Sequence, residues 1–161
     1  MSSAPHRPQR RRWAIAAAIA VGLAVGLGGF TFVYARGASY LTNDPEACGN
    51  CHIMDEHLSA WMKSSHHAVA TCNDCHTPHN VVGKYVTKGK NGFWHSFYFT
   101  TGRFPDPLRI TEGNRDVTEG TCRYCHGDIV DAIDPPTRSS ATDPGQLSCI
   151  RCHRYVGHLV R

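Results

Sequence analysis

The sequence Cys48-Gly-Asn-Cys51-His52 decides the fold of this chain, because the same pattern of five residues recurs three more times. The further copies are Cys72-Asn-Asp-Cys75-His76, Cys122-Arg-Tyr-Cys125-His126 and Cys149-Ile-Arg-Cys152-His153. Together the four copies contain all 8 cysteines of the 161 residues. Two thiols at this spacing can form thioethers to one haem, and the adjacent histidine can then bind the iron. The four motifs predict a tetrahaem c-type cytochrome.

Zinc sites and disulfides are the alternative uses of paired cysteines. Two Cys-x-x-Cys pairs can hold one zinc ion, and single pairs occur in thioredoxin-like redox sites or as structural disulfides. None of these explains a histidine directly after the second cysteine in all four copies. Repetition also strengthens a motif that is only moderately specific when it occurs once. The pattern favours covalent haem, and with it electron transfer.

An uncharged apolar stretch, residues 13–35, precedes the first motif. At about 1.5 Å per residue, a helix of this length covers the roughly 30 Å hydrocarbon core of a bilayer. Arginines gather before it, whereas only Arg36 follows it before Asp44. The positive-inside rule then predicts a cytoplasmic segment 1–12, a transmembrane anchor 13–35 and a periplasmic haem domain 36–161. We expect a single-pass protein of the inner (cytoplasmic) membrane.

A cleaved signal peptide is the alternative interpretation of this segment. Val33-Tyr34-Ala35 is an acceptable small-residue cleavage site. The apolar stretch is longer than the roughly 7–15 residues of a signal-peptide core, which favours a retained anchor. In both cases the haem domain lies outside the cytoplasm.

About 125 residues follow the anchor, enough for one small domain. The whole chain contains 15 glycines and 9 prolines and few long apolar runs, which cannot build a conventional core. We therefore predict a mainly α fold with long loops, organised around its haems. Asp44-Pro45-Glu46 is typical of a helix start that leads into the first motif. The net charge of +4 gives no indication of nucleic-acid binding.

The spacing of the motifs suggests two dihaem halves. Cys48 and Cys72 are 24 residues apart and Cys122 and Cys149 are 27 apart, with 50 residues between the two pairs. This order is compatible with a duplication. Loops of uneven length produce the same spacing, and the sequence does not distinguish the two.

Each haem needs a second axial ligand from outside its motif if it is to be low-spin. Six histidines lie beyond the motifs and the N-terminal His6, namely His57, His66, His67, His79, His95 and His158. Met54 extends the first motif to Cys-x-x-Cys-His-x-Met. Its thioether either competes with His52 for the iron or packs against the porphyrin edge.

The anchor, the four motifs, the first-motif run Cys-Gly-Asn-Cys-His-Ile-Met and residues 64–76 resemble the NapC/NirT family of membrane quinol dehydrogenases. Within that family, Met54 and the runs 91–97 and 102–104 resemble the small subunit of cytochrome c nitrite reductase, the NrfH type. The resemblance covers almost the whole chain. Its most discriminating part is the methionine after the first motif.

The resemblance implies ligands for the first and second haems. The first haem, nearest the membrane, takes Met54 in place of His52. The second haem pairs His76 with His158, which lies five residues beyond the last motif.

The resemblance also implies ligands for the third and fourth haems. The third pairs His126 with His67, five residues before the second motif, and the adjacent His66 is the alternative. The fourth is held by His153 on one side and by a lysine of the catalytic partner on the other.

The quinol site implied by the resemblance lies beside the first haem. Quinol oxidation releases two protons with two electrons, so the site needs a base, a hydrogen-bond donor and a haem edge. Lys88 corresponds to the family's lysine. Some members have an acidic residue seven positions later, where this chain has His95, which can ligate the iron or accept the proton. Lys84 and Lys90 are interpreted as solvated charges near lipid headgroups.

The resemblance implies a quinol-oxidising electron-transfer enzyme of anaerobic respiration. It takes electrons from menaquinol and passes them through four haem c groups to a periplasmic pentahaem nitrite reductase, which forms ammonium in a hetero-oligomeric complex. The alternatives are the same role for another reductase, such as nitrate reductase, a passive membrane-tethered electron carrier, and a terminal reductase. Reduction of the haems by a menaquinol analogue distinguishes the quinol dehydrogenase from the passive carrier.

Overall fold

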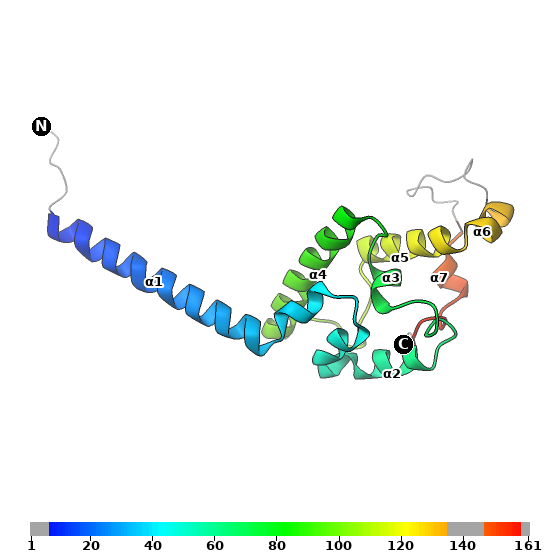
Figure 1. The fold of residues 1–161 in the computed structure, drawn as a ribbon, viewed down its shortest axis with the longest axis horizontal. Helices are drawn as coiled ribbons and strands as arrows, with labels where there is room; N and C mark the ends of the chain where they lie inside the picture. The colour runs from blue at the N-terminus through cyan, green and yellow to red at the C-terminus, as the bar shows by residue number, and fades with distance from the viewer. Residues whose placement is uncertain (1–6, 135–146, 159–161) are drawn as a thin grey trace, which may run out of the picture. The chain divides into compact units, whose positions relative to one another are not determined.

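A computed structural model describes residues 7–134 and 147–158 of the chain. The chain divides into two compact units, Met1–Ser39 and Tyr40–Arg161, each of which is described by itself. All regular elements among the described residues are helices, joined by loops and turns (Figure 1). The predicted mainly α fold is confirmed. The unit Tyr40–Arg161 contains the four motifs and is called the haem domain below.

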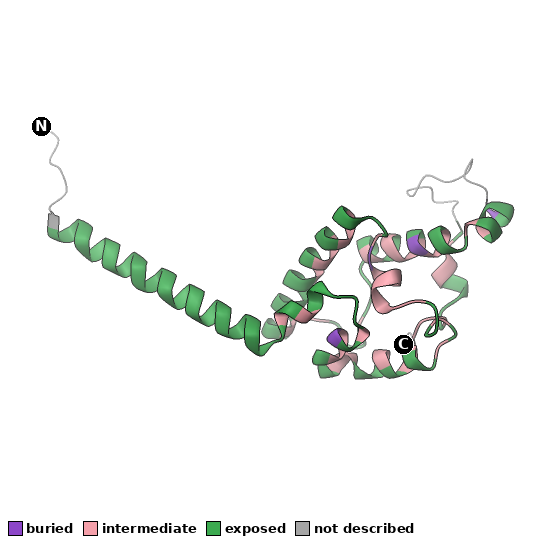
Figure 2. Cartoon of the chain, viewed as in Figure 1, coloured by how far each residue is buried: buried purple, intermediate pink, exposed green. Residues whose placement is uncertain are grey.

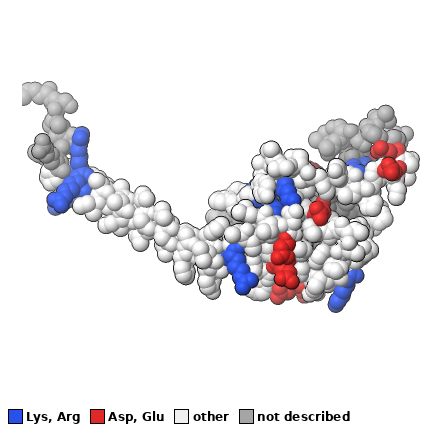
Figure 3. Space-filling model, viewed as in Figure 1, with Lys and Arg blue, Asp and Glu red and all other residues white. Residues whose placement is uncertain are grey.

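The first unit consists mainly of one long helix, α1 (Arg7–Tyr34). Its segment Pro8–Tyr34 has a mean hydropathy of 2.1 and is long and apolar enough to cross a membrane. Basic side chains gather at the N-terminal end of α1, and the rest of the helix carries no charge (Figure 3). The helix begins before the predicted anchor because the arginines that precede the apolar stretch are themselves helical. The chain continues from α1 into a short 3-10 helix, η1 (Gly37–Leu41).

The first motif lies in two 3-10 helices, η2 (Pro45–Asn50) and η3 (His52–Met54), which lead into α2 (Asp55–Met62). Asp44 caps η2 by accepting a 2.9 Å hydrogen bond from the backbone N–H of Glu46, and Pro45 occupies the first turn. The predicted helix start is therefore confirmed, although the helix is 3-10. The same segment, η2, packs against α2.

The second motif forms a short helix of its own, α3 (Cys72–His76). Thr71 and Asp74 form its capping box, in which the Asp74 carboxylate accepts hydrogen bonds from the backbone N–H and the hydroxyl of Thr71 at 2.8 and 2.7 Å. The long helix α4 (Val81–Thr101) follows, capped by Asn80. It ends at Gly102, whose φ of 67° lies in the left-handed region that favours glycine.

The third and fourth motifs lie on helices in the C-terminal part of the haem domain. The third ends α5 (Glu112–Cys125), which is followed by α6 (Gly127–Ile133), and the fourth forms α7 (Cys149–Cys152). Both α3 and α7 pack against α5. The helix α5 thus contacts the helices of the second and fourth motifs while it carries the third.

The described residues bury few side chains against one another. Ala47 is the only buried apolar residue among them, and no side chain there is fully buried. Figure 2 shows exposed and partly covered residues along nearly all helices. This arrangement agrees with the prediction that haems, rather than apolar side chains, supply the interior.

Hydrogen bonds from α5 hold the start of the fourth motif. The Glu119 carboxylate accepts bonds from the Ser148 hydroxyl and from the backbone N–H groups of Cys149 and Ile150, the latter two at 2.8 and 3.4 Å. One turn further along α5, the Arg123 guanidinium donates to Asp134 at 2.9 Å and to the carbonyl of Leu147. The partly covered carboxylate therefore fixes the first turn of α7.

We expect the substitution Glu119→Gln to loosen this turn. A glutamine side chain offers one acceptor oxygen in place of two and carries no charge, and each hydrogen bond to a charged group is worth about 1.5–3 kcal/mol. Amide hydrogen exchange at Cys149 and Ile150 in the haem-loaded protein should become roughly tenfold faster. The control is Asp116→Asn, an exposed acid one turn earlier. Equal exchange in the two variants would contradict a positioning role for Glu119.

Candidate haem-binding sites

The helices place the two cysteines of a motif for attachment to one group. In the second, third and fourth motifs the cysteines are three residues apart within one helix, so they lie on the same side of it. His76 is the last residue of α3, and His126 and His153 follow the last helical residues of α5 and α7. The first motif differs, because Cys51 has an extended backbone conformation between η2 and η3.

Hydrogen bonds link neighbouring motifs to one another. The hydroxyl of Thr121, a buried residue one position before the third motif, donates to the carbonyl of Cys75 in the second motif at 3.0 Å. The thiols of Cys48 and Cys72 are hydrogen bonded, which lowers the pKa of Cys48 to about 7. The second motif thus contacts the first motif and the residue that precedes the third.

His76 and His158, which the resemblance assigns to the second haem, lie close together and form the first pair of imidazoles. Their ring centres are 5.9 Å apart and the ring planes differ by 13°. Two imidazoles that bind one metal from opposite sides each contribute a metal–nitrogen bond of about 2 Å and the distance from that nitrogen to the ring centre. Their ring centres would therefore lie about 6 Å apart. Burial, together with the neighbouring His158, His57 and His95, lowers the pKa of His76 to about 4. The neutral form, which is the one that binds metal, is therefore favoured.

His66 and His126 form the second pair, with ring centres 6.1 Å apart and ring planes at 80°. Nδ1 of His66 lies 3.1 Å from the carbonyl oxygen of Val156. A carbonyl only accepts hydrogen bonds, so this contact requires the proton on Nδ1, whereas the Ser65 hydroxyl, 3.2 Å from the same nitrogen, can donate or accept; with the proton on Nδ1, the lone pair of Nε2 is left to bind a metal. The separation and the tautomer both suit an axial ligand.

His67, the predicted partner of His126, lies elsewhere. Its ring packs edge-on against Trp61 with 4.7 Å between ring centres, and its side chain is exposed. The indole N–H of Trp61 donates to the carbonyl of Ala70 at 3.1 Å, which closes the turn that carries both histidines. The structure therefore brings His66, the alternative in the sequence, beside His126, and places His67 against Trp61.

Two further histidines contact the sites without a role assigned from the sequence. The ring of His57 lies 4.8 Å from that of His158, so it adjoins the pair with His76. His79 stacks on Tyr124 of the third motif at 4.1 Å. The position of His57 on α2, directly after the first motif, was the one signal in the sequence that it could reach a haem site.

Around the first motif, Met54 is partly covered whereas His52 is exposed. Both residues lie in η3, so they follow the cysteines within a single short turn. The hydroxyl of Tyr40 lies 3.9 Å from the sulfur of Cys51. Of the two candidate ligands for the first haem, Met54 is therefore the less exposed to solvent.

Lys88 joins α4 to the segment that leads into the first motif. Its ammonium donates hydrogen bonds to the carbonyl of Tyr40 at 3.2 Å and to that of Thr42. Desolvation lowers the pKa of Lys88, and the charge of Lys84 lowers it further. The Cys48 thiolate opposes this shift, and its charge is lost once that sulfur forms a thioether.

His95 lies seven residues after Lys88, two turns along α4, and so on the same face of the helix. Its ring is 6.4 Å from that of Phe99. The side chain of His95 is exposed. Neighbouring protein groups still remove part of its water, and this desolvation lowers the pKa of His95. The structure thus places the two residues predicted for quinol chemistry on one side of one helix.

The donor set fits covalent haem better than zinc. Cysteine pairs at attachment spacing are combined with two pairs of imidazoles at the separation of axial ligands. Within residues 7–134 and 147–158, no three side chains of the type that holds zinc come together in one cluster. These residues would hold haem through their thiols and imidazoles.

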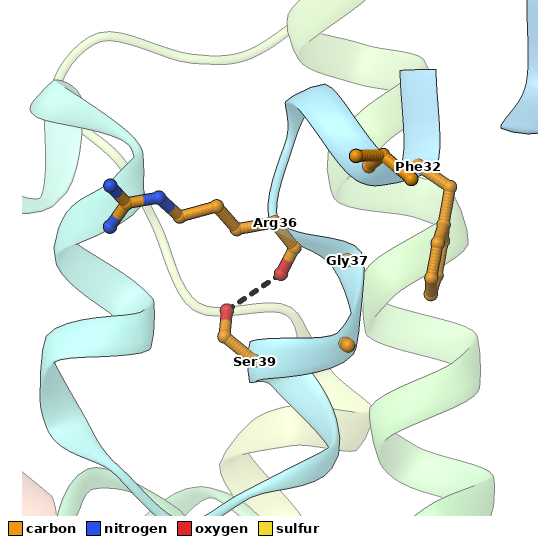
Figure 4. A pocket seen from close by; sticks show the side chains of 6 residues that line it. Phe32, Arg36, Gly37 and Ser39 are labelled. Carbon is orange, nitrogen blue, oxygen red and sulfur yellow. Dashed lines mark hydrogen bonds between the residues drawn. The ribbon is translucent and has the colours of Figure 1, made fainter. Parts of the chain in front are cut away.

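A small open pocket of about 240 Å³ lies at the C-terminal end of α1 (Figure 4). Its lining includes Phe32, Arg36 and Gly37, and the hydroxyl of Ser39 donates to the carbonyl of Arg36 at 2.8 Å. A side chain at position 37 would overlap the ring of Phe32, which explains a glycine there. The pocket contains no carboxylate or histidine and so offers no base for quinol oxidation.

The chain is similar to known proteins over most of its length. The chain matches the NapC/NirT cytochrome c family, N-terminal region, over residues 8–161. It is 34% identical over 143 residues to the cytochrome c-type protein NrfH of Wolinella succinogenes, which covers 84% of this chain and 81% of that protein. It is 30% identical over 125 residues to the cytochrome c nitrite reductase subunit NrfH of Nitratidesulfovibrio vulgaris, with 78% and 73% covered.

A solved structure is also similar to this one. A chain in the crystal structure of the cytochrome c nitrite reductase NrfHA complex bound to the HQNO inhibitor superposes with a TM-score of 0.59 at 25% sequence identity. The match covers 91% of this chain and 90% of that one. Sequence and fold therefore agree, and the chain belongs to the NapC/NirT cytochrome c family.

Proposed function

We propose that this chain is a membrane-anchored menaquinol dehydrogenase that delivers electrons to a periplasmic multihaem nitrite reductase. The observation that carries the electron-transfer role is the pair of imidazole couples at 5.9 and 6.1 Å in a chain with four haem motifs. Strong axial ligands on both sides of an iron suit electron transfer better than substrate binding.

The placement in the membrane follows from α1. Its apolar segment spans a bilayer, and the arginines at its start favour the cytoplasmic side. The haem domain then lies in the periplasm, with residues 1–12 in the cytoplasm and 13–35 as the anchor.

The ligand assignments form part of the proposal. When bound, the four haems supply a series of one-electron carriers between quinol and the partner protein. The second haem is held by His76 and His158, and the third by His126 and His66. The exposed His153 serves the fourth haem, whose other ligand is a lysine of the partner.

Met54 serves the first haem, with His52 as the alternative ligand. Support comes from the partly covered side chain of Met54 beside the exposed His52. A methionine ligand raises the reduction potential relative to a second histidine.

Lys88 and His95 are proposed to act on the quinol. Oxidation of menaquinol to menaquinone releases two protons and two electrons, so a group at the site must accept protons. A neutral His95 accepts a proton at its free ring nitrogen, and Lys88 orients the quinol oxygen by donating a hydrogen bond. Because Lys88 already donates to two backbone carbonyls, its ammonium is held in place before the quinol binds.

The partner assignment is supported by the relatives. The two relatives named NrfH are 34% and 30% identical, and the NapC protein of Escherichia coli K12 is 29% identical over 139 residues. The similar solved chain belongs to a complex named NrfHA. We therefore propose a hetero-oligomer with the pentahaem catalytic subunit of cytochrome c nitrite reductase.

The assignment of His66 is testable by spectroscopy of the haem-loaded protein. We expect His66→Gln to remove one strong axial ligand and to convert about one haem per chain from low-spin to high-spin. The matched variant His67→Gln should leave the spin states unchanged, because His67 packs on Trp61. Electron paramagnetic resonance and magnetic circular dichroism measure both. High-spin haem produced by His67→Gln alone would make His67 the ligand.

The complete function is testable on a complex purified through this chain in mild detergent. Supplied anaerobically with a menaquinol analogue, the sample should show reduced haems, loss of nitrite and formation of ammonium. Reduced haems with unchanged nitrite would retain the quinol role and reject this partner. Haems that stay oxidised would favour the passive electron carrier.

The same assay tests Lys88. We expect Lys88→Met to slow haem reduction by quinol by about a hundredfold, because the quinol oxygen loses the hydrogen bond that orients it. Reduction by dithionite should be unchanged, because it bypasses the quinol. Lys63→Met, at an exposed lysine that ends α2, is the control.

A further inference from the structure

The helix α4 has its polar and apolar faces reversed with respect to an ordinary surface helix. Its exposed side is apolar over four turns, with Val82 exposed by 75%, Val86 by 63% and Phe93 by 64%. Val81, Tyr85 and Phe97 lie on the same side and are also exposed. A helix on the surface of a soluble domain normally turns such residues inwards.

Over the first three turns of α4 the covered side is polar, whereas near the end of the helix the partly covered residue is Phe99. Gly83, Lys84, Thr87, Lys88 and Asn91 are partly covered, and Figure 2 shows the helix covered along one side and exposed along the other. Lys88 fastens this side to the carbonyls of Tyr40 and Thr42. These hydrogen bonds set the rotation of the helix about its axis, so the apolar side is held outwards.

We propose that the outward face of α4, formed by Val81, Val82, Tyr85, Val86, Phe93 and Phe97, rests in the interfacial layer of the bilayer and binds anionic phospholipid. A contiguous exposed apolar face of this kind marks an interaction surface. The inference depends on the proposed membrane anchoring but not on quinol oxidation or on the nitrite reductase partner.

The charges of α4 favour lipid over a second protein. The helix has no acidic residue, and its exposed lysine, Lys90, lies one turn from Val86 and Phe93, whereas Lys84 and Lys88 lie on the covered side. Apolar and aromatic side chains beside lysines are typical of helices that lie in the plane of a membrane surface. Lysines close to the surface are attracted by anionic headgroups.

The length of the connection also favours lipid. Only residues 35–39 separate the end of α1 from the start of the haem domain. Even fully extended, they and the bonds that flank them span about 20 Å. An anchored α1 therefore keeps the haem domain at the membrane surface, where contact with lipid is an intramolecular event and does not require high affinity.

The proposal is tested with the full-length, haem-loaded protein in nanodiscs that contain anionic phospholipid with a photoreactive acyl chain. After illumination, mass spectrometry identifies the labelled residues. We expect labels in α1 and on the outward residues of α4. Labels confined to α1 would overturn the proposal.

Variants separate the α4 face from general exposure. Val82→Asp combined with Val86→Asp should lower labelling of α4 by about tenfold, because a charge is strongly disfavoured among acyl chains, and labelling of α1 should not change. Ile129→Asp is the matched control, since Ile129 on α6 is 65% exposed. Unchanged labelling of α4 in the double variant would contradict the proposal. An unaltered haem spectrum shows that each variant is folded.

The catalytic partner is the competing occupant of this face. Adding the nitrite reductase subunit should leave the labels on α4 in place, and their loss would assign the face to the partner and overturn the proposal. Haem reduction by a menaquinol analogue is measured in the same nanodiscs. Labelling of α4 without such reduction would support the membrane contact while it rejects the quinol function.

Discussion

The hydrogen bonds made by α5 are the interaction on which the haem domain depends. Thr121 binds the carbonyl of Cys75 in the second motif, and Glu119 binds the start of the fourth. Each bond involves a partly or fully covered polar group, for which loss of the partner is costly. The helix α5 carries the third motif and therefore fixes the second and fourth motifs relative to it.

Polar contacts have this importance because the chain has so little apolar interior of its own. Ala47 is the only buried apolar residue in the part of the chain that is described, whereas Thr77, Thr121 and Asp134 are buried there. Capping groups and single hydrogen bonds position the short helices, and we expect the haems to complete the interior. A protein of this kind folds together with its cofactors, as metal-binding domains do when binding and folding share one free energy.

Lys88 connects the chemistry proposed for α4 with the proposed membrane contact. The ammonium that fastens α4 to the approach of the first motif also turns the apolar residues of the helix outwards. His95 lies two turns beyond Lys88 on the same side of α4 and is exposed, so the two predicted quinol residues share a helix with the surface proposed to contact lipid. Such a helix would let a lipid-soluble substrate approach without crossing open water.

The sequence by itself determined the features that depend on local spacing. Cysteines three residues apart with an adjacent histidine predicted the haem sites, and an uncharged stretch of sufficient length predicted the long apolar helix α1. The helix start at Asp44 was also predictable, because a cap acts within one turn.

Only the tertiary structure places His66, rather than His67, beside His126 and reveals the reversed faces of α4. Adjacent residues look alike in a sequence, and the choice between them depends on Val156 and His126, which are distant along the chain. The outward side of α4 likewise depends on where Lys88 finds its carbonyl partners. Contacts between distant segments are set by the packing of the whole domain, and local spacing does not encode them.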